Sequence, residues 1–238
     1  MCGRYVAPEA ADIEREWNLA HVSNPFDRIN YNTSPTHQVP ALRRGDDGAP
    51  ALVALRWGLI PFWAKGLAPK YNTINATIER MREAPTYRGP WRRGQRCIVP
   101  AYGFYEWQNV AVAGGKSIKR PYYIGIGDQR IFGMAGLWDS STGEEGAMIE
   151  SCTLITLPAN RFMAAIHNSR ERMPAILERD QHDAWLEDDA EAAWACLKPY
   201  DDQLMLARVV SSRVNSPKHN DATLIDEVLG ADAVTGPE

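Results

Sequence analysis

The first five residues, Met1-Cys2-Gly3-Arg4-Tyr5, include the side chain with the most distinctive chemistry of the chain. Removal of the initiator methionine, which is usual before a small side chain, leaves Cys2 at the amino terminus. Its α-amine then has a pKa of about 7.7 to 8.0, so much of it is an uncharged nucleophile at neutral pH. Amine and thiol together react with an aldehyde, first to a Schiff base and then to a five-membered thiazolidine. The alternative is that Cys2 is an incidental small residue at a frayed chain end.

Composition restricts the class of protein before any further motif is considered. The 238 residues are 45% hydrophobic and 24% charged, which suits one large globular domain or two small ones. No apolar run reaches the roughly 18 residues of a membrane span, and the start lacks the apolar region of a secretory signal. The cysteines are widely spaced without a C-x-x-C pair, which argues against a zinc site or a disulfide framework. We therefore expect a cytoplasmic protein without metal or other cofactor.

An arginine-rich stretch is the one candidate for binding an acidic polymer, since the net charge is −4. Between residues 80 and 96, Tyr87 and Trp91 alternate with arginines and only Glu83 opposes them; the arginines are Arg80, Arg82, Arg88, Arg92, Arg93 and Arg96. Cations that neutralise phosphates beside rings that stack on bases are typical of a groove for single-stranded nucleic acid. The alternative is a solvated basic face.

The pattern of hydrophobic and turn residues predicts mixed elements rather than regular β-α alternation. Helices are expected at 8–19, 76–83, 158–166 and within 179–197. Strands are expected at 38–43, 51–57, 96–100, 103–108, 121–127, 130–138, 150–157 and 204–210. Gly89-Pro90 predicts a turn, and the apolar loop from 58 to 71 is expected to line a cavity.

No repeat or linker divides the chain, so we expect an α+β fold with one domain from residue 1 to 238. Short strands dominate its middle, which favours a curved, largely antiparallel sheet with flanking helices. The polar tail after about residue 215 is expected to be irregular.

Several longer motifs occur in a specific order along the chain. They are M-C-G-R-Y at residue 1, Y-N-T-S-P at 31, W-G-L-I-P-F-W-A-K at 57, I-N-A-T-I-E at 74, R-C-I-V-P-A-Y-G-F-Y-E-W at 96, T-L-I-T-L-P-A-N at 153 and I-H-N-S-R-E-R-M-P at 166. A weaker echo, V-N-S-P-K-H-N, follows at 214. In the order and spacing of these motifs, the chain resembles the SRAP family. The members of this family are abasic-site processing proteins that were once described as SOS-response-associated peptidases.

The resemblance implies a protein that binds single-stranded DNA and captures the ring-opened aldehyde of an abasic site. Cys2 would be the nucleophile, and Asn75 would hold the opened sugar. Glu106 would exchange protons during ring opening and closure, and His167 would assist the Schiff-base step. The sequence leaves protein partners undetermined, and no contact with a membrane is expected.

These roles also agree with the chemistry of the residues themselves. A carboxyl group among aromatic neighbours, such as Glu106, has its pKa raised by desolvation, and a histidine carries protons near neutral pH. Each residue also has a structural alternative: a hydrogen-bonded strand glutamate, a packed histidine, and a helix cap at Asn75.

For DNA contacts, the resemblance points to Arg4, Trp63 and Trp107, with Thr156 as a further pocket residue. Without this resemblance, both tryptophans would be assigned to the hydrophobic core. One position departs from the family pattern: an arginine that contacts the DNA backbone commonly follows the asparagine by two residues, and Thr77 stands there. Arg80 and the arginines after it are candidates to compensate.

Three classes of function remain open from the sequence. The favoured one is a covalent sensor of abasic sites, with lyase activity when Schiff-base chemistry proceeds to strand cleavage. The second is a thiol peptidase with Cys2 as nucleophile and His167 as base, limited to self-processing after Met1. The third is a noncatalytic single-strand-binding module.

Overall fold

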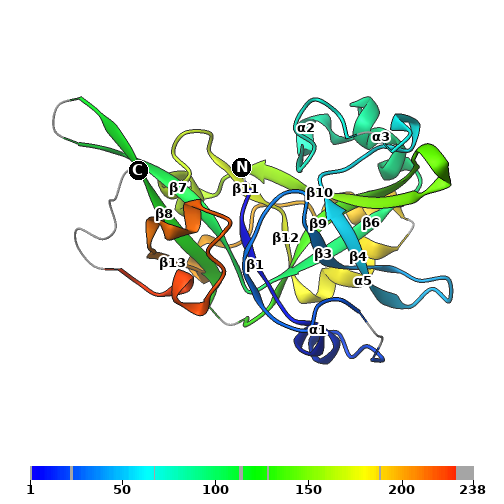
Figure 1. Cartoon of the computed structure of the whole chain (residues 1–238), viewed down its shortest axis with the longest axis horizontal. Coiled ribbons are helices and arrows are strands. Elements are labelled where there is room, and N and C mark those ends of the chain that lie inside the picture. Colours follow the sequence, from blue (N-terminus) through cyan, green and yellow to red (C-terminus); the bar gives the residue numbers. More distant parts are fainter. Residues whose placement is uncertain are drawn as a thin grey trace.

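The strands divide into two sheets, as Figure 1 shows. The computed structural model describes residues 2–21, 24–66, 68–112, 115–127, 129–187 and 189–228. Most strand pairs within these ranges are antiparallel, and several short helices accompany them. The α+β class and the largely antiparallel pairing are confirmed, whereas the division of the strands into two sheets was not anticipated.

The first sheet has the strand order β13-β8-β7-β1-β2. Its centre is a long hairpin of β7 (Gly103–Ala111) and β8 (Ser117–Ile126). The short strand β1 (Tyr5–Ala7) lies between β7 and β2 (Asn30–Thr33), and β13 (Met205–Val209) covers the other edge of β8. The chain therefore starts beside the middle of this hairpin.

The second sheet contains a small closed barrel. Its ring consists of β3 (Gln38–Arg44), β4 (Pro50–Trp57), β6 (Arg96–Ala101), β9 (Phe132–Thr142) and β10 (Met148–Pro158). The ring closes because β10 pairs in parallel with β4 and antiparallel with β9. Three short strands extend it: β5 (Asn75–Thr77) and β11 (Arg172–Pro174) along β10, and β12 (Ile176–Leu177) along β9.

The helices are short and lie around the sheets. They are α1 (Ala10–Glu16), α2 (Ile78–Met81), α3 (Pro85–Arg92), α4 (Arg161–Ile166), α5 (His182–Leu186) and α6 (Ala190–Ala195). The 3-10 turns are η1 (Phe62–Ala64), η2 (Glu144–Gly146), η3 (Arg179–Gln181), η4 (Asp202–Leu204), η5 (Ser212–Asn215) and η6 (Ala222–Ile225). In the described part of the chain, no helix is long and apolar enough to cross a bilayer.

Three local predictions need correction or extension. The prediction of a turn at Gly89-Pro90 was wrong, because both residues lie inside α3. This helix begins with Pro85, at the first helical position, which tolerates proline. The helix expected from residue 76 starts only at Ile78, since the residues before it form β5 against β10. The tail expected to be irregular includes η6, and its residues 229–238 lie outside the described ranges.

Part of the arginine-rich stretch is built into the fold. The guanidinium carbon of Arg82 lies 3.7 Å from the ring centroid of Trp194, and Arg96 is 2% exposed and donates to the Trp185 carbonyl. Trp91 is itself only 5% exposed, so the prediction that its ring stacks on bases was wrong. The basic-face alternative applies to the exposed arginines that remain, among them Arg80, Arg88 and Arg92.

Gly103 sets how closely β7 packs against Tyr123 on β8. A Cβ atom at this position would lie 2.3 Å from the Tyr123 ring, so Gly103→Ala forces the ring or the strand to shift. We expect a loss of about 1–3 kcal/mol in the free energy of unfolding, measured by urea denaturation. Gly125→Ala is the matched control, because its Cβ would meet nothing closer than 3.7 Å. Equal stability of the two variants would contradict the prediction.

Candidate active site

The predicted catalytic residues meet at the junction between the two sheets. Cys2 precedes β1, whose Tyr5 pairs with Phe104 of β7, and Glu106 follows two residues along the same strand. Asn75 begins β5 on the barrel, and His167 ends α4. In Figure 1 the amino terminus lies between the first sheet and the barrel. Residues distant in sequence are thus brought together by strand pairing on both sides.

A hydrogen bond connects Cys2 with the barrel. The side-chain amide of Asn75 donates to the Cys2 carbonyl over 2.9 Å, and the Tyr87 hydroxyl donates to the Asn75 carbonyl over 3.3 Å. Because Asn75 lies in β5 and Thr77 is the residue that precedes α2, the helix-cap alternative for Asn75 is excluded. The Asn75 Oδ1 atom is buried and accepts no hydrogen bond from the described residues. It is therefore available to a ligand's hydroxyl or amine.

Glu106 and His167 form a buried acid–base pair. Their side chains approach to 3.7 Å between Oε2 and Nε2, and the residues are 2% and 4% exposed. The His167 Nδ1 atom lies 2.9 Å from the Arg172 carbonyl, to which an Nδ1–H donates. That bond directs Nε2 toward Glu106. The pair can pass a proton between the two side chains.

Burial sets the protonation of the site. It raises the pKa of the Glu106 carboxyl, while the nearby His167 acts in the opposite direction. Burial also raises the pKa of the Cys2 thiol well above its ordinary value, and the Glu106 charge adds to that rise. The thiol is therefore protonated at neutral pH, and its sulfur needs a proton acceptor before it can bond to carbon. Glu106 is the nearby carboxyl group that acts on it electrostatically.

A cavity of about 530 Å³ lies on the barrel side of the site. It is lined by Asn75, Thr77 and Arg80 together with two exposed rings, Trp63 at 46% and Tyr71 at 53% exposure. The loop expected to line a cavity contributes these rings, with Trp63 in η1. The structure thus brings four predicted site residues into one cavity: Trp63, Asn75, Thr77 and Arg80.

A second cavity of about 290 Å³ lies on the side of β7. Glu106, Trp107 and His167 line it, and the Trp107 indole donates to Asn215 over 2.8 Å. Asn72 lines both cavities, so they adjoin across this residue. Asn75 thus lines the first cavity, and Glu106 and His167 line the second. Cys2 is buried and lines neither cavity, but its carbonyl is bonded to Asn75.

Arg4 and Thr156 lie apart from both cavities. Arg4 donates to Asn32 over 2.8 Å and to the carbonyls of Val214 and Asn215. Thr156 is fully buried, and its carbonyl accepts from Arg172 over 2.6 Å. Both side chains take part in contacts within the fold beneath the site.

Asn32 and Arg172 were missed as supporting residues. The Asn32 amide donates to the carbonyls of Val214, Ser216 and His219, and Arg172 also binds Glu79 through both of its terminal nitrogens. The motifs that begin at residues 31, 166 and 214 contain most of these residues, but their spacing gives no indication of which pairs meet.

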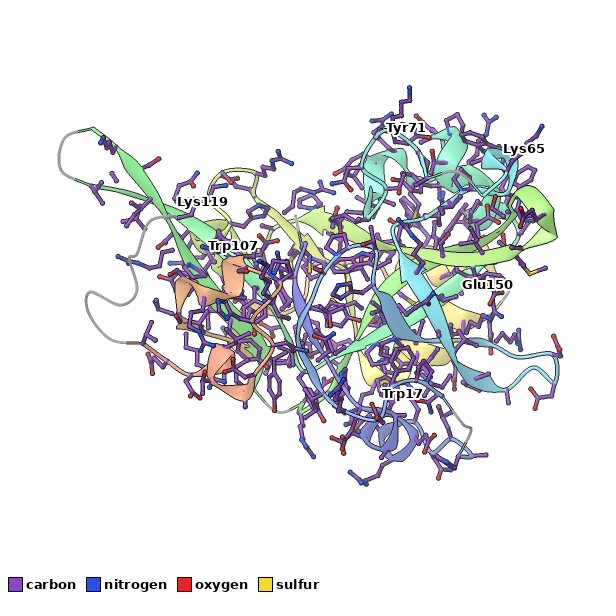
Figure 2. The ribbon with its side chains drawn as sticks, in the orientation of Figure 1. Trp17, Lys65, Tyr71, Trp107, Lys119 and Glu150 are labelled. Carbon is purple, nitrogen blue, oxygen red and sulfur yellow. The ribbon has the colours of Figure 1, made fainter. Side chains whose placement is uncertain are left out.

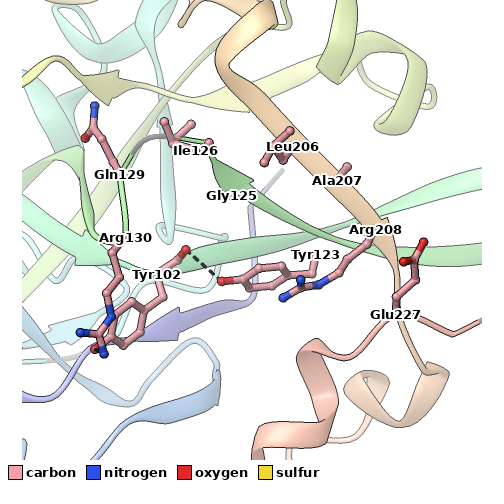
Figure 3. A pocket seen from close by; sticks show the side chains of 11 residues that line it. Tyr102, Tyr123, Gly125, Ile126, Gln129, Arg130, Leu206, Ala207, Arg208 and Glu227 are labelled. Atoms are coloured by element: carbon pink, nitrogen blue, oxygen red, sulfur yellow. Dashed lines mark hydrogen bonds between the residues drawn. The ribbon is translucent and has the colours of Figure 1, made fainter.

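Another cavity, of about 610 Å³, lies on the opposite face of the β7–β8 hairpin from Glu106. Figure 3 shows Tyr102, Tyr123 and Arg208 around it. Tyr123 pairs with Tyr105, and side chains alternate along a strand, so Glu106 points to the other face. None of the predicted site residues lines this cavity.

Metal-ligand clusters are absent from the part of the chain that the structure describes: no three His, Cys, Asp or Glu side chains converge. Cys2, Cys97, Cys152 and Cys196 are all free thiols.

Comparison with protein families identifies the group to which this architecture belongs. The model described as "SOS response associated peptidase (SRAP)" matches residues 1–217. The chain belongs to the SRAP family. The match includes every predicted catalytic and DNA-binding residue.

Individual relatives extend this assignment. The SRAP chain is 36% identical over 231 residues to the abasic site processing protein YoaM of Bacillus subtilis, covering 95% of this chain and 98% of the relative. It is 30% identical to the abasic site processing protein YMR114C of Saccharomyces cerevisiae, covering 98% and 70% of the two chains. A crystal structure of a protein from Bacteroides thetaiotaomicron has 27% identity and a TM-score of 0.80, covering 96% of this chain and 100% of that one.

The Glu106 charge is expected to control the reactivity of Cys2. In Glu106→Gln the carboxylate no longer raises the thiol pKa, so more thiolate forms at a given pH and alkylation by iodoacetamide shifts to lower pH. Mass spectrometry of the amino-terminal tryptic peptide across a pH series measures this shift. Glu191→Gln removes an exposed carboxylate of α6 and should leave the profile unchanged. Identical profiles for both variants would refute the coupling.

Proposed function

We propose that this SRAP protein captures abasic sites in single-stranded DNA as a covalent thiazolidine at Cys2 after removal of Met1. The observation that carries the proposal is the convergence of a buried acid–base pair, Glu106 and His167, on an amino-terminal cysteine fixed by Asn75. The relatives named as abasic site processing proteins support the same substrate.

The reaction needs no external oxidant or reductant. The uncharged α-amine of Cys2 adds to the aldehyde carbon of the ring-opened sugar, and the carbinolamine loses water to give a Schiff base. The thiol sulfur then bonds to the same carbon, and the thiol proton is transferred by way of a base to the ring nitrogen. Each cross-link thus releases one water. Met1 must leave first, because an acylated nitrogen cannot form the Schiff base.

Glu106 and His167 move the protons in these steps. A carboxyl group with a raised pKa donates a proton to the departing hydroxyl group and, once ionised, accepts the thiol proton. His167 accepts and returns protons through Nε2, and its Nδ1 contact with Arg172 fixes the ring. Asn75 presents Oδ1 to the hydroxyl groups of the opened sugar.

The DNA strand lies across the two cavities. Trp63 and Trp107 stack on bases beside the lesion, where one stacked base contributes about 1–3 kcal/mol. Arg80 binds a phosphate in place of the arginine that Thr77 replaces, and the Thr77 hydroxyl adds a neutral hydrogen bond. Arg4 and Thr156 act from beneath by fixing β1 and the barrel edge.

A general thiol peptidase is less well supported, although the family description names a peptidase. Such an enzyme needs an activated thiolate, whereas burial raises the pKa of the Cys2 thiol. His167 also directs Nε2 to Glu106. Self-processing after Met1 remains compatible with the covalent sensor, because it exposes the reactive amine.

Cross-linking is tested by intact-protein mass spectrometry after incubation with a single-stranded oligonucleotide that carries one abasic site. We expect loss of Met1 and a stable adduct with the abasic strand, smaller by one water than the sum of the reactants. Cys2→Ala should bind the strand without a stable adduct, because its amine forms only a reversible Schiff base. Cys196→Ala, which removes another buried thiol, should react normally.

The controls separate the three functions. A stable adduct with undamaged DNA, or with Cys2→Ala, would contradict the thiazolidine. Wild-type binding to abasic DNA with no adduct at all would favour the noncatalytic module. Cleavage of unrelated peptides that depends on Cys2 would favour the peptidase.

Restoring an arginine at position 77 should add one phosphate contact. For Thr77→Arg we expect tighter binding to single strands and a salt dependence steeper by about 0.7 in log K against log salt. Fluorescence anisotropy across a salt series measures the slope. Thr142→Arg adds the same charge at an exposed position of β9 outside both cavities and should leave the slope nearly unchanged. A slope for Thr77→Arg equal to that of the control would disprove the contact.

A further inference from the structure

Two exposed cations line the second cavity without taking part in the chemistry described above. Lys119 extends from β8, and Arg170 belongs to the loop that follows His167. Neither side chain forms a hydrogen bond or an ion pair with the residues that the structure describes. Glu106, already paired with His167, contributes the single carboxylate of the lining. The cavity lining therefore carries two cationic side chains that have no ion-pair partner among the described residues.

The loop that carries Arg170 is held firmly against β7. The Asn168 side chain accepts from the Asn109 backbone N–H and donates to the Asn109 carbonyl, each over 2.9 Å. Gln108 on the same strand donates to the Ala165 carbonyl over 2.9 Å. The Arg170 backbone N–H donates to the His167 carbonyl over 3.2 Å. These contacts fix the position of Arg170 relative to the catalytic histidine.

The first cavity contains a corresponding cation on the barrel side. The Arg80 side chain is exposed there, also without a hydrogen bond or ion pair to the described residues, and no carboxylate lines this cavity. The two cavities adjoin at Asn72. In Figure 2, Lys119 and Trp107 lie along the upper edge of the first sheet, and Tyr71 lies along the upper edge of the barrel side. Cations thus stand on either side of the junction that holds Cys2, Asn75 and Glu106.

We propose that Lys119 and Arg170 bind backbone phosphates on one side of the abasic nucleotide, while Arg80 binds a phosphate on the other side. This inference rests on the proposed function and places phosphate contacts on both sides of the abasic nucleotide. Opposed cations fix the strand at two points, so the opened sugar between them is held over Asn75 and Glu106. The ligand of the Lys119–Arg170 pair is accordingly the sugar–phosphate backbone, irrespective of base sequence.

The first test uses undamaged single-stranded DNA, so it is independent of cross-linking. Fluorescence anisotropy across a salt series should show that Lys119→Ala/Arg170→Ala lowers the slope of log K against log salt by about 1.4, or two phosphate contacts. Lys116→Ala/Arg161→Ala removes two exposed cations from neighbouring segments outside both cavities and serves as the control. A double variant that behaves like this control overturns the proposal.

The second test determines direction with tetrahydrofuran abasic analogues, which have no aldehyde and cannot cross-link. One oligonucleotide carries the analogue at its 5′ end and the other at its 3′ end, so each offers phosphates on one side only. Lys119→Ala/Arg170→Ala should weaken binding of one oligonucleotide, and Arg80→Ala should weaken binding of the other. Equal losses on both oligonucleotides overturn the assignment.

The outcomes also separate this inference from the proposed function. If each variant weakens binding of a different oligonucleotide but no thiazolidine forms, the covalent sensor is contradicted and the phosphate assignment is supported. Normal thiazolidine formation, without a loss of binding confined to one oligonucleotide, would support the covalent sensor and overturn the phosphate assignment.

Discussion

The hydrogen bond from the Asn75 amide to the Cys2 carbonyl joins the two halves of the structure at the residue proposed as the nucleophile. Cys2 belongs to the first sheet through β1, and Asn75 belongs to the barrel through its pairing with Leu154 of β10. The bond therefore forms only when both sheets are complete and correctly placed. Glu106 and His167 depend on the same arrangement, because they reach the junction from β7 and α4.

The strand β1, which follows Cys2, is short and relies on polar contacts for its position. Arg4 and Asn32 together bind carbonyls of the segment from residue 214 to 219, and Asn32 is 1% exposed. An intramolecular hydrogen bond contributes only about 0.5–1.5 kcal/mol net, but a buried partner left unsatisfied costs about 1–3 kcal/mol. This asymmetry makes the network a strong determinant of where β1 lies, even though no single contact in it is strong.

Local patterns in the sequence predicted much of the fold, whereas the resemblance to the SRAP family supplied the residues proposed for the site. The hairpin of β3 and β4, the long strands from residue 96 onward and the raised pKa of Glu106 all follow from nearby residues. The structural roles of Trp91 and Arg4 did not, because each depends on residues far away in sequence. Trp194 packs edge-on against Trp91, and Arg4 reaches Val214 across 210 positions. The sequence alone shows neither the packing of Trp91 nor the contacts of Arg4 within the fold, because both depend on the tertiary structure.

The contact between Arg4 and the segment near residue 214 also has a consequence for synthesis. Arg4 is made 210 and 211 residues before Val214 and Asn215, so its contacts with their carbonyls form only after the strands that pair with β1 have been made. A contact of such long sequence separation closes slowly compared with the local hairpins. During that interval the amino terminus is not yet enclosed, so the loss of Met1 that the proposed function requires can take place before the contacts of Arg4 with residues 214 and 215 form.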